Sequence, residues 1–316
     1  MATLLDPVRS IPSAPARPVR EGWGERIAPY VYIAPFFVIF GIFGLVPLLF
    51  TFYVALFDWN PIGEHVFVGL DNFRRLFDDP RFFGAVRNTL SIWVLSTVPQ
   101  LIIALLVAHL LNHVRLRFAL LFRMSMLVPY ITSVAATTIV FTQLFDRDYG
   151  MLNWLLGFVG IDHVDFVQST WGSHLLIAAM VTWRWSGYTT LLYLASLQAV
   201  PREVYEAASV DGAGGWQQFR HISVPSLRPV IVFTVVTSTI GGLQIFTEPL
   251  LLNPGASITC GPIRQCQTLT LFLFEQGFGQ FQFGYGSAIG VALFVMVVVI
   301  AGINYLLSTR VRRESR

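Results

Sequence analysis

The stretch from Pro201 to Pro229, PREVYEAASVDGAGGWQQFRHISVPSLRP, decides how the rest of the chain is interpreted. Pro201 suits the first turn of a helix, and Glu203 stabilises the positive end of the helix dipole. Gly212 supplies a left-handed stop. Together these residues predict a helix of about three turns over residues 202–211.

The surface of this predicted helix suits close contact with another molecule. Ala207, Ala208 and Ser209 form a low-relief side, and Glu206 places a charge near the centre of the helix. A Gly-Ala-Gly-Gly run then turns the chain into a second helix that begins near Trp216. We infer a short helix held parallel to the membrane surface, in a position to contact a cytoplasmic partner. The alternative is a loop that only caps two membrane spans.

Long apolar segments flank this loop on both sides. A helix needs about 20 mostly apolar residues to cross a hydrocarbon core of about 30 Å. Of the 316 residues, 54% are hydrophobic and 12% are charged, whereas a soluble domain has about 25% charged residues. The sequence therefore predicts an all-α membrane protein with six transmembrane helices, in a membrane domain over residues 27–309. The predicted spans are residues 27–57, 89–111, 124–145, 174–200, 229–252 and 285–307.

The arginines predict the orientation, because positively charged loops stay in the cytoplasm. Fourteen of the 21 arginines lie in the two tails and in the loops after the second and fourth spans, and five lie in the other loops. Both termini and the loop over residues 201–228 are therefore predicted to be cytoplasmic. Residues 1–26, which contain four prolines among small and charged residues, are predicted to be a disordered tail. Residues 310–316 are predicted to be a basic tail.

All 21 basic residues are arginine, and the absence of lysine excludes several chemistries. The chain has no GxxxxGK[ST] nucleotide-binding loop, no Schiff-base lysine and no lysine general base. It also lacks a serine elbow and an HExxH motif, so we predict no catalytic residues, no enzyme activity and no nucleic-acid partner. His109 and His113 have the spacing of a helical metal pair, but no carboxylate lies near them in the sequence. We expect interfacial histidines and no metal site.

The outward loops contain the two cysteines. Cys260 and Cys266 lie in TCGPIRQC, and a turn between them would let the thiols oxidise outside the cytoplasm. We predict a small structural disulfide, with two free thiols as the alternative. Residues 58–88 and 146–172 carry aromatic residues between charges, which predicts short helices at the membrane surface. These aromatic residues form either a belt at the lipid headgroups or a docking surface for a partner.

Polar residues inside the predicted spans are candidates for a substrate path. Arg184 lies near the middle of the fourth span, where a charge is a functional candidate by default; pairing with Glu248 or with a helix-end carbonyl is the structural alternative. Gly241 and Gly242 favour a break or close packing in the fifth span. Beyond them, the spacing of Gln244 and Glu248 predicts one shared helical face. The candidate residues are Trp183, Arg184, Trp185, Gln244, Thr247 and Glu248.

Several fixed positions of the cytoplasmic loop match a known motif. Glu206-Ala207-Ala208, Gly212, Ile222 and Val224-Pro225 resemble the EAA loop of permease subunits in binding-protein-dependent ABC importers. That family favours leucine where this chain has Val224. A chance match at five positions has a probability on the order of 10⁻⁵.

Other segments extend the resemblance over nearly the whole membrane region. FVGLDNFRRLF, RNTL and GYGSAIG resemble the carbohydrate-uptake branch, in particular the first of its two permease subunits, related to the larger maltose-type permease. TWRWSGY, LASLQAVP, EPLLLNP and QTLTLFLFEQGF are similar to actinobacterial permeases for cellobiose and related oligosaccharides. The asparagines that the maltose type has around the fifth span are absent.

This resemblance implies an ABC type I importer permease fold in the bacterial cytoplasmic membrane. The implied partners are membrane lipid, a second permease subunit in a heterodimer, a cytoplasmic ABC ATPase dimer and an exported sugar-binding protein. The ATPase would bind ATP and Mg, and this chain would hold no cofactor. The implied ATPase-coupling residues are Glu206 for a charged contact, Ala207 and Ala208 for close packing, Asp211, and Gly212 for the turn.

Two other classes of protein make different predictions. A self-contained secondary transporter or channel would need its own gate and usually an internal repeat or intramembrane carboxylates, whereas only Glu248 is a clear intramembrane acid here. A membrane-embedded enzyme would have clustered catalytic residues. Co-purification with an ATPase and a second permease separates the three classes.

Overall fold

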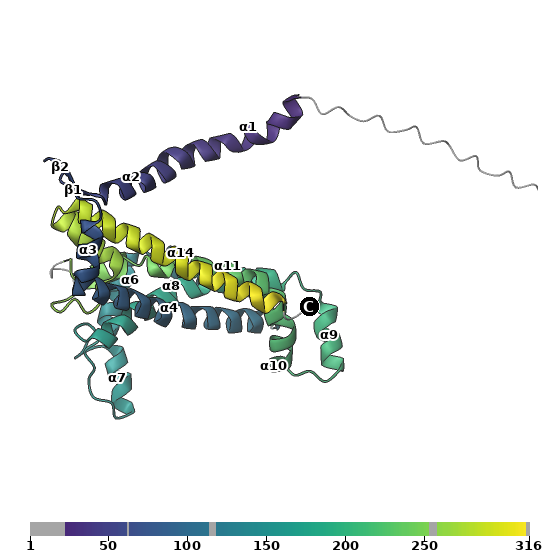
Figure 1. Cartoon of the computed structure of the whole chain (residues 1–316). Coiled ribbons are helices and arrows are strands. Elements are labelled where there is room, and N and C mark those ends of the chain that lie inside the picture. The colour runs from purple at the N-terminus through teal and green to yellow at the C-terminus, as the bar shows by residue number, and fades with distance from the viewer. Residues whose placement is uncertain (1–22, 62, 114–117, 253–257, 314–316) are drawn as a thin grey trace, which may run out of the picture. The chain divides into compact units, whose positions relative to one another are not determined.

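The computed structural model describes residues 23–61, 63–113, 118–252 and 258–313 (Figure 1). The predicted disordered tail lies mostly outside these residues. Its last four residues, 23–26, are described, and they belong to helix α1 (Trp23–Phe40). Residues 310–313 of the predicted basic tail continue the last helix, α14 (Phe283–Arg313).

By its internal contacts the chain divides into two units, residues 1–50 and 51–316. The described part of the first unit is helical, through α1, the π-helical turn η1 (Gly41–Leu45) and the start of α2 (Val46–Val54). At η1 the Val46 amide donates to the Gly41 carbonyl five residues back, which is the hydrogen bond of a π-helix. This turn contains Gly41 and Gly44, two glycines of the first predicted span.

After the end of α2, the second unit continues with a short hairpin. β1 (Phe57–Trp59) pairs antiparallel with β2 (His65–Phe67), and Phe57 lies opposite Phe67. Helix α3 (Asp71–Asp78) follows, and the Asn72 side-chain amide donates to the Ala55 and Phe57 carbonyls at 2.9 Å each. Within residues 58–88 the structure thus has the short helix α3, as the sequence predicts, and also a hairpin that the sequence does not predict.

Four long helices form the core of the second unit (Figure 1). They are α4 (Pro80–His113), α8 (Thr170–Leu197), α11 (Val224–Leu243) and α14. α8 packs along α4, and α11 contacts α4, α8 and α14. Ala104 and Ala108 of α4 are fully buried in one cluster with Tyr193 and Leu197 of α8. Such small residues let two helices approach closely, and in lipid this packing is what attracts one helix to another.

Four helices among the described residues are long and apolar enough to span a membrane, and a bent pair would make a fifth. The four cover residues 27–54, 80–113, 215–243 and 283–307. The fourth predicted span, residues 174–200, forms helix α8 up to Leu197 but is less apolar. Many of its serine, threonine and glycine residues are buried against neighbouring helices, where polar groups are tolerated. The count of six spans therefore stays a prediction.

Two predicted spans are interrupted in the structure. The third, residues 124–145, is divided between α5 (Ala119–Ile131) and α6 (Val134–Leu144), which meet at 93°. The Thr132 amide and hydroxyl both donate to the Val128 carbonyl, at 3.1 and 2.7 Å, and so satisfy polar groups at the bend. The fifth span ends as α11 at Leu243, and a separate helix, α12 (Thr247–Leu252), follows.

Several shorter elements of the second unit lie at the two ends of the four-helix core (Figure 1). At one end, where α4 ends and α11 begins, lie α9 (Arg202–Val210), α10 (Gly215–Gln218) and the π-helical turn η2 (Phe219–Ser223). At the other end lie the hairpin, α3, α7 (Met151–Phe158), α13 (Leu269–Phe274) and the π-helical turn η3 (Glu275–Gly279).

Candidate functional site

The loop helix α9 is attached to the core through one buried side chain. Tyr205 is the buried residue of this helix, and its hydroxyl lies 3.0 Å from Ser223 Oγ. Glu206 and Ala207 are exposed, and Ala208 is half-buried. The ion pairs among the described residues do not include Glu206. The helix therefore turns a carboxylate and a small residue outward, as a surface that another molecule can contact.

A glycine turn ends this helix, one residue earlier than the sequence predicts. Gly212 has a φ of +84°, a left-handed conformation that glycine adopts at little cost. Its amide donates to the Ser209 carbonyl at 3.1 Å, and the Ala213 amide donates to the Ala208 carbonyl at 2.8 Å. These are the two bonds of a Schellman motif. Asp211 is the exposed C-cap residue of the helix.

One exposed apolar residue on α9 is missing from the predicted site. Val210 is 88% exposed and lies beside Glu206 and Ala207, because residues three and four positions apart share a helix face. We call Glu206, Ala207 and Val210 the α9 surface. Val210 could have been identified from the sequence, because an apolar residue at the end of a charged loop helix is a candidate contact residue. Beyond the turn, Trp216 is 68% exposed.

A second candidate site is a cavity of about 400 Å³ that is lined by α4, α5, α8, α11 and α12. Five of the six predicted substrate-path residues line it: Arg184, Trp185, Gln244, Thr247 and Glu248. The sixth, Trp183, instead packs against Phe141, with their ring centroids 5.6 Å apart.

Gln244 and Glu248 reach this cavity in a different way from the prediction. They do not share a helical face, because α11 ends at Leu243 and α12 begins at Thr247. The unwound residues 244–246 bring both side chains to the cavity wall. Unwound backbone at membrane depth is tolerated where it lines a cavity.

A buried ion pair crosses this cavity wall. Arg184 Nη1 of α8 lies 3.1 Å from Glu248 Oε1 of α12, and the two side chains are 13% and 10% exposed. The Arg184 Nε is also buried, and among the described atoms none accepts a hydrogen bond from it. The pair leaves the cavity wall with one positive and one negative charge that compensate each other.

Sequence reasoning did not find several other polar and aromatic groups of the cavity. The Gln100 side-chain amide of α4 donates to Thr189 Oγ1 of α8 at 3.0 Å. Tyr130 of α5 stacks on Tyr188 and meets Trp185 edge to face, with both centroid distances 5.2 Å. Gln100 was detectable as an amide inside an apolar span. The aromatic group was not, because its members come from two helices whose contact the sequence does not reveal.

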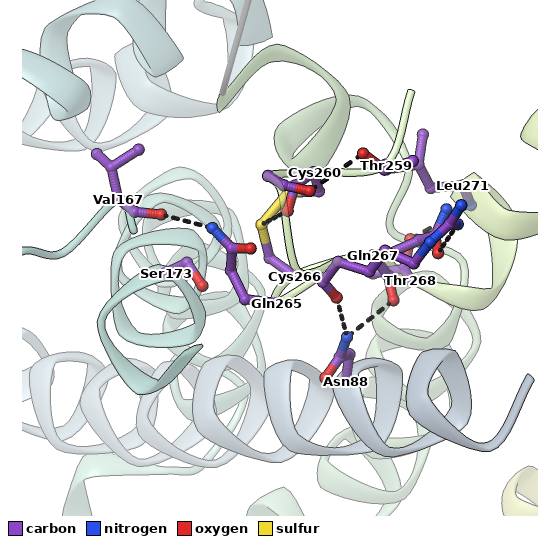
Figure 2. Close-up of a disulfide and its surroundings, with 12 residues drawn as sticks. Asn88, Val167, Ser173, Thr259, Cys260, Gln265, Cys266, Gln267, Thr268 and Leu271 are labelled. Atoms are coloured by element: carbon purple, nitrogen blue, oxygen red, sulfur yellow. Dashed lines mark hydrogen bonds between the residues drawn. A yellow bond between two sulfur atoms is a disulfide. The ribbon is translucent and has the colours of Figure 1, made fainter. Parts of the chain in front are cut away.

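The loop that precedes α13 is closed by a disulfide between Cys260 and Cys266 (Figure 2). The Asn88 side-chain amide of α4 donates to the Arg264 and Gln267 carbonyls at 3.0 and 3.1 Å. From the same loop, the Gln265 side chain donates to the Val167 carbonyl (Figure 2). The loop is thus fastened to α4 and to the segment before α8.

Two buried carboxylates form hydrogen bonds at the end of the core that carries the disulfide loop. Burial alone would raise the pKa of Glu275, but hydrogen bonds from Arg264 and Gln267 outweigh burial and lower it. Burial would likewise raise the pKa of Asp79, but hydrogen bonds from Arg81 and Tyr285 lower it. Both carboxylates therefore keep their charge at neutral pH.

His109 and His113 lie close together, with ring centroids 4.3 Å apart. Each ring directs a nitrogen to a separate partner: His109 Nδ1 to Ser223 Oγ and His113 Nε2 to Gln218 Oε1. In the part of the chain that the structure describes, histidine, cysteine and acidic side chains do not form a group of three or more that could hold a metal ion.

Comparison with known proteins places these features in context. Residues 87–313 match the family model described as "Binding-protein-dependent transport system inner membrane component". The arabinooligosaccharides transport system permease protein AraP of Halalkalibacterium halodurans is 34% identical over 88% of this chain and 86% of its own length. The lactose transport system permease protein LacF of Rhizobium radiobacter is 33% identical over 87% of this chain and 92% of its own.

A third relative and a solved structure agree with these matches. The trehalose/maltose transport system permease protein MalF of Thermococcus litoralis is 30% identical over 90% of this chain and 94% of its own. The fold is similar to that of a chain in a bacterial ABC transporter that imports the acidic polysaccharide alginate. The TM-score is 0.74 at 22% identity, over 91% of this chain and 97% of that one.

Proposed function

Because the chain belongs to the family of binding-protein-dependent transport system inner membrane components, we propose that it forms half of the translocation path of an ATP-driven importer of neutral oligosaccharides. A second permease subunit forms the other half, and a separate ABC ATPase dimer binds ATP and Mg. A sugar-binding protein outside the membrane delivers the substrate. Sugar transport is also what the names of the relatives AraP, LacF and MalF describe.

The observation that carries this proposal is the α9 surface. A short helix that buries only Tyr205, and exposes Glu206, Ala207 and Val210, stands at the end of the four-helix core. In our proposal this surface rests against the ATPase, and closure of the ATPase dimer moves α9 together with the helices attached to it. Such coupling requires contacts that differ between the two states of the complex.

The cavity supports a neutral sugar as the substrate. Aromatic faces of Tyr188 and Trp185 lie beside hydrogen-bonding groups such as Gln244 and Thr247, and sugars use both kinds of contact. Arg184 and Glu248 compensate each other's charge, so the cavity offers an anionic sugar no free cation among these described residues. In our proposal, the binding protein and this cavity together determine which neutral oligosaccharide is transported, cellobiose included.

The position of the disulfide supports the proposed orientation, with both termini in the cytoplasm. Asn88 contacts the disulfide loop and His113 contacts the α9 end of the core. The 25 residues between these two positions of α4 span about 37 Å at 1.5 Å per residue, enough to cross a hydrocarbon core of about 30 Å. Disulfides persist outside the cytoplasm, which leaves α9 on the inside.

The exposed aromatic residues of α7 lie on the outward side in this orientation. Trp154 is 63% and Phe158 is 73% exposed. They are suited either to the lipid headgroups or to a docking surface for the binding protein, as the sequence predicts for residues 146–172.

Affinity purification of the tagged chain from its native membrane, in mild detergent, tests the proposal. We expect a second permease and an ABC ATPase to co-purify with it, and we expect Glu206→Cys to form a cross-link to the ATPase subunit. Glu64→Cys, at an exposed position beside the hairpin at the other end of the core, is the control for non-specific cross-linking. Recovery of the chain as a homo-oligomer without an ATPase would contradict the proposal.

A further inference from the structure

Two polar bridges join the loop helix α9 to the ends of α4 and α11. In the first, Ser223 Oγ lies 3.0 Å from the Tyr205 hydroxyl and 2.9 Å from His109 Nδ1. In the second, Gln218 lies between His113 and Ser209 of α9. These contacts, the packing of Tyr205 against His113 and the two turns of the loop connect α9 to the ends of the membrane helices.

The orientation of the Gln218 side-chain amide is fixed by a backbone acceptor. Its nitrogen lies 3.1 Å from the Ala213 carbonyl oxygen and 2.8 Å from Ser209 Oγ. A carbonyl oxygen only accepts hydrogen bonds, so the amide nitrogen has to face Ala213. The Gln218 Oε1 therefore faces His113.

Both ring nitrogens of His113 face oxygen atoms that only accept hydrogen bonds. Nε2 lies 3.1 Å from Gln218 Oε1, and Nδ1 lies 2.9 Å from the backbone carbonyl oxygen of His109. A neutral imidazole has one donor nitrogen and one acceptor nitrogen, whereas the protonated ring donates from both. Only the protonated ring satisfies both contacts.

The surroundings of His113 are compatible with a positive charge. His113 lies in the last turn of α4, where the helix dipole favours a cation. The titratable side chains that face its ring are His109 of α4 and Tyr205 of α9, with centroids 4.3 and 5.0 Å away. α10 contributes Gln218, which carries no charge. Among the described residues His113 forms no ion pair, and residues 114–117 lie outside the described part.

We propose that His113 is a positioning residue for transport: in its protonated form it fastens α9 to α4 through Gln218. Loss of this proton leaves the ring one donor nitrogen for two acceptors, so the tautomer that keeps its proton on Nδ1 loses the contact with Gln218 and the bridge weakens. The ATPase then moves α9 with less effect on the membrane helices. Transport per ATP hydrolysed therefore falls as the cytoplasmic pH rises. This inference rests on the proposed function.

The experiment measures the ratio of sugar imported to ATP hydrolysed. Proteoliposomes contain the complete complex, hold ATP inside at a set pH, and take up labelled sugar from the binding protein outside. The sugar is the one that the wild-type complex imports from a panel of lactose, cellobiose, maltose and arabino-oligosaccharides. Between an internal pH of about 6 and about 8, the range in which histidine loses its charge, we expect the wild-type ratio to fall at least about threefold.

Variants separate the proton from a merely structural role. His113→Gln and Gln218→Leu are expected to give a low ratio at both pH values. His113→Arg should keep a high ratio at both, because a guanidinium donates to two carbonyls and stays charged. The control His221→Gln should retain the wild-type profile, since His221 is exposed and contacts only the backbone of Gln217.

Three outcomes would overturn the inference: a wild-type ratio that does not change with pH, a His113→Gln ratio that keeps the wild-type pH dependence, or a His113→Arg ratio as low as that of His113→Gln. If the His113→Gln variant does not assemble, the His113→Arg variant and the pH profile of the wild type still test the inference. Absence of ATP-driven uptake by the wild-type complex at every pH would instead contradict the proposed function itself.

Discussion

Replacing Gly212 with proline is expected to abolish ATP-driven uptake while the complex still assembles. The proline ring fixes φ near −65°, whereas Gly212 has a φ of +84°. Proline also removes the amide that donates to the Ser209 carbonyl. The turn after α9 then cannot form, and Glu206 no longer lies where the ATPase needs it. Uptake into proteoliposomes and size-exclusion chromatography of the complex measure the two halves of this prediction.

Milder substitutions at Gly212 distinguish a turn requirement from a packing requirement. Among the described atoms, nothing lies within 4 Å of a Cβ added at Gly212, so alanine meets only backbone strain of about 1 kcal/mol. Gly212→Asn should retain more uptake than Gly212→Ala, because asparagine tolerates the left-handed conformation. Equal loss in both variants would argue against the turn as the cause.

The same coupling can be tested on the α9 surface. Glu206→Lys is expected to abolish uptake, since it reverses the charge of the predicted ATPase contact. Glu64→Lys, the same charge reversal at an exposed position beside the hairpin at the other end of the core, should retain most of it. Normal transport by both Glu206→Lys and Gly212→Pro would contradict the proposed coupling role of the loop.

Glu248→Gln is expected to have the second large effect, a loss of uptake of at least about tenfold. It leaves the Arg184 guanidinium unpaired on the cavity wall, where both side chains are nearly buried. Breaking a buried pair by removing one partner costs about 3 to 5 kcal/mol. The unpaired cation also changes the net charge of the cavity, which we propose to be matched to a neutral sugar.

The double variant Arg184→Gln with Glu248→Gln is the control for the charge. It removes both charges and keeps similar side-chain volumes, so we expect it to recover a substantial part of the uptake lost in Glu248→Gln alone. Uptake and thermal stability of the purified complex are measured together for all variants. Wild-type uptake by Glu248→Gln would show that the ion pair has no role in the path.

The loop over residues 201–228 was predictable because local rules determine its structure. The sequence predicts a helix over residues 202–211 with a glycine stop, and the structure has α9 over Arg202–Val210 with Gly212 in the left-handed region. The family resemblance that started from this loop is confirmed by the match over residues 87–313 and by the relatives above 30% identity. The predicted coupling roles stay predictions.

The bend in the third span could not be predicted in the same way, whereas Gly241 and Gly242 predicted a break or close packing in the fifth span, and α11 ends at Leu243 directly after them. Hydropathy averages over a window of residues, whereas the bend after Ile131 depends on Thr132 bonding back to Val128. The cavity likewise contains some residues that could be predicted from the sequence and some that could not. Arg184 and Glu248 were detectable as charges in apolar segments, but the stacking of Tyr130 on Tyr188 requires the packing of α5 against α8.

The most direct test of the central claim is uptake by proteoliposomes assembled from purified components. The liposomes contain this chain alone, or this chain with the second permease and the ATPase, with the sugar-binding protein outside and ATP inside. We predict uptake of a labelled neutral oligosaccharide only when all partners and ATP are present. Uptake by this chain alone, without ATP, would contradict the account and indicate a self-contained transporter.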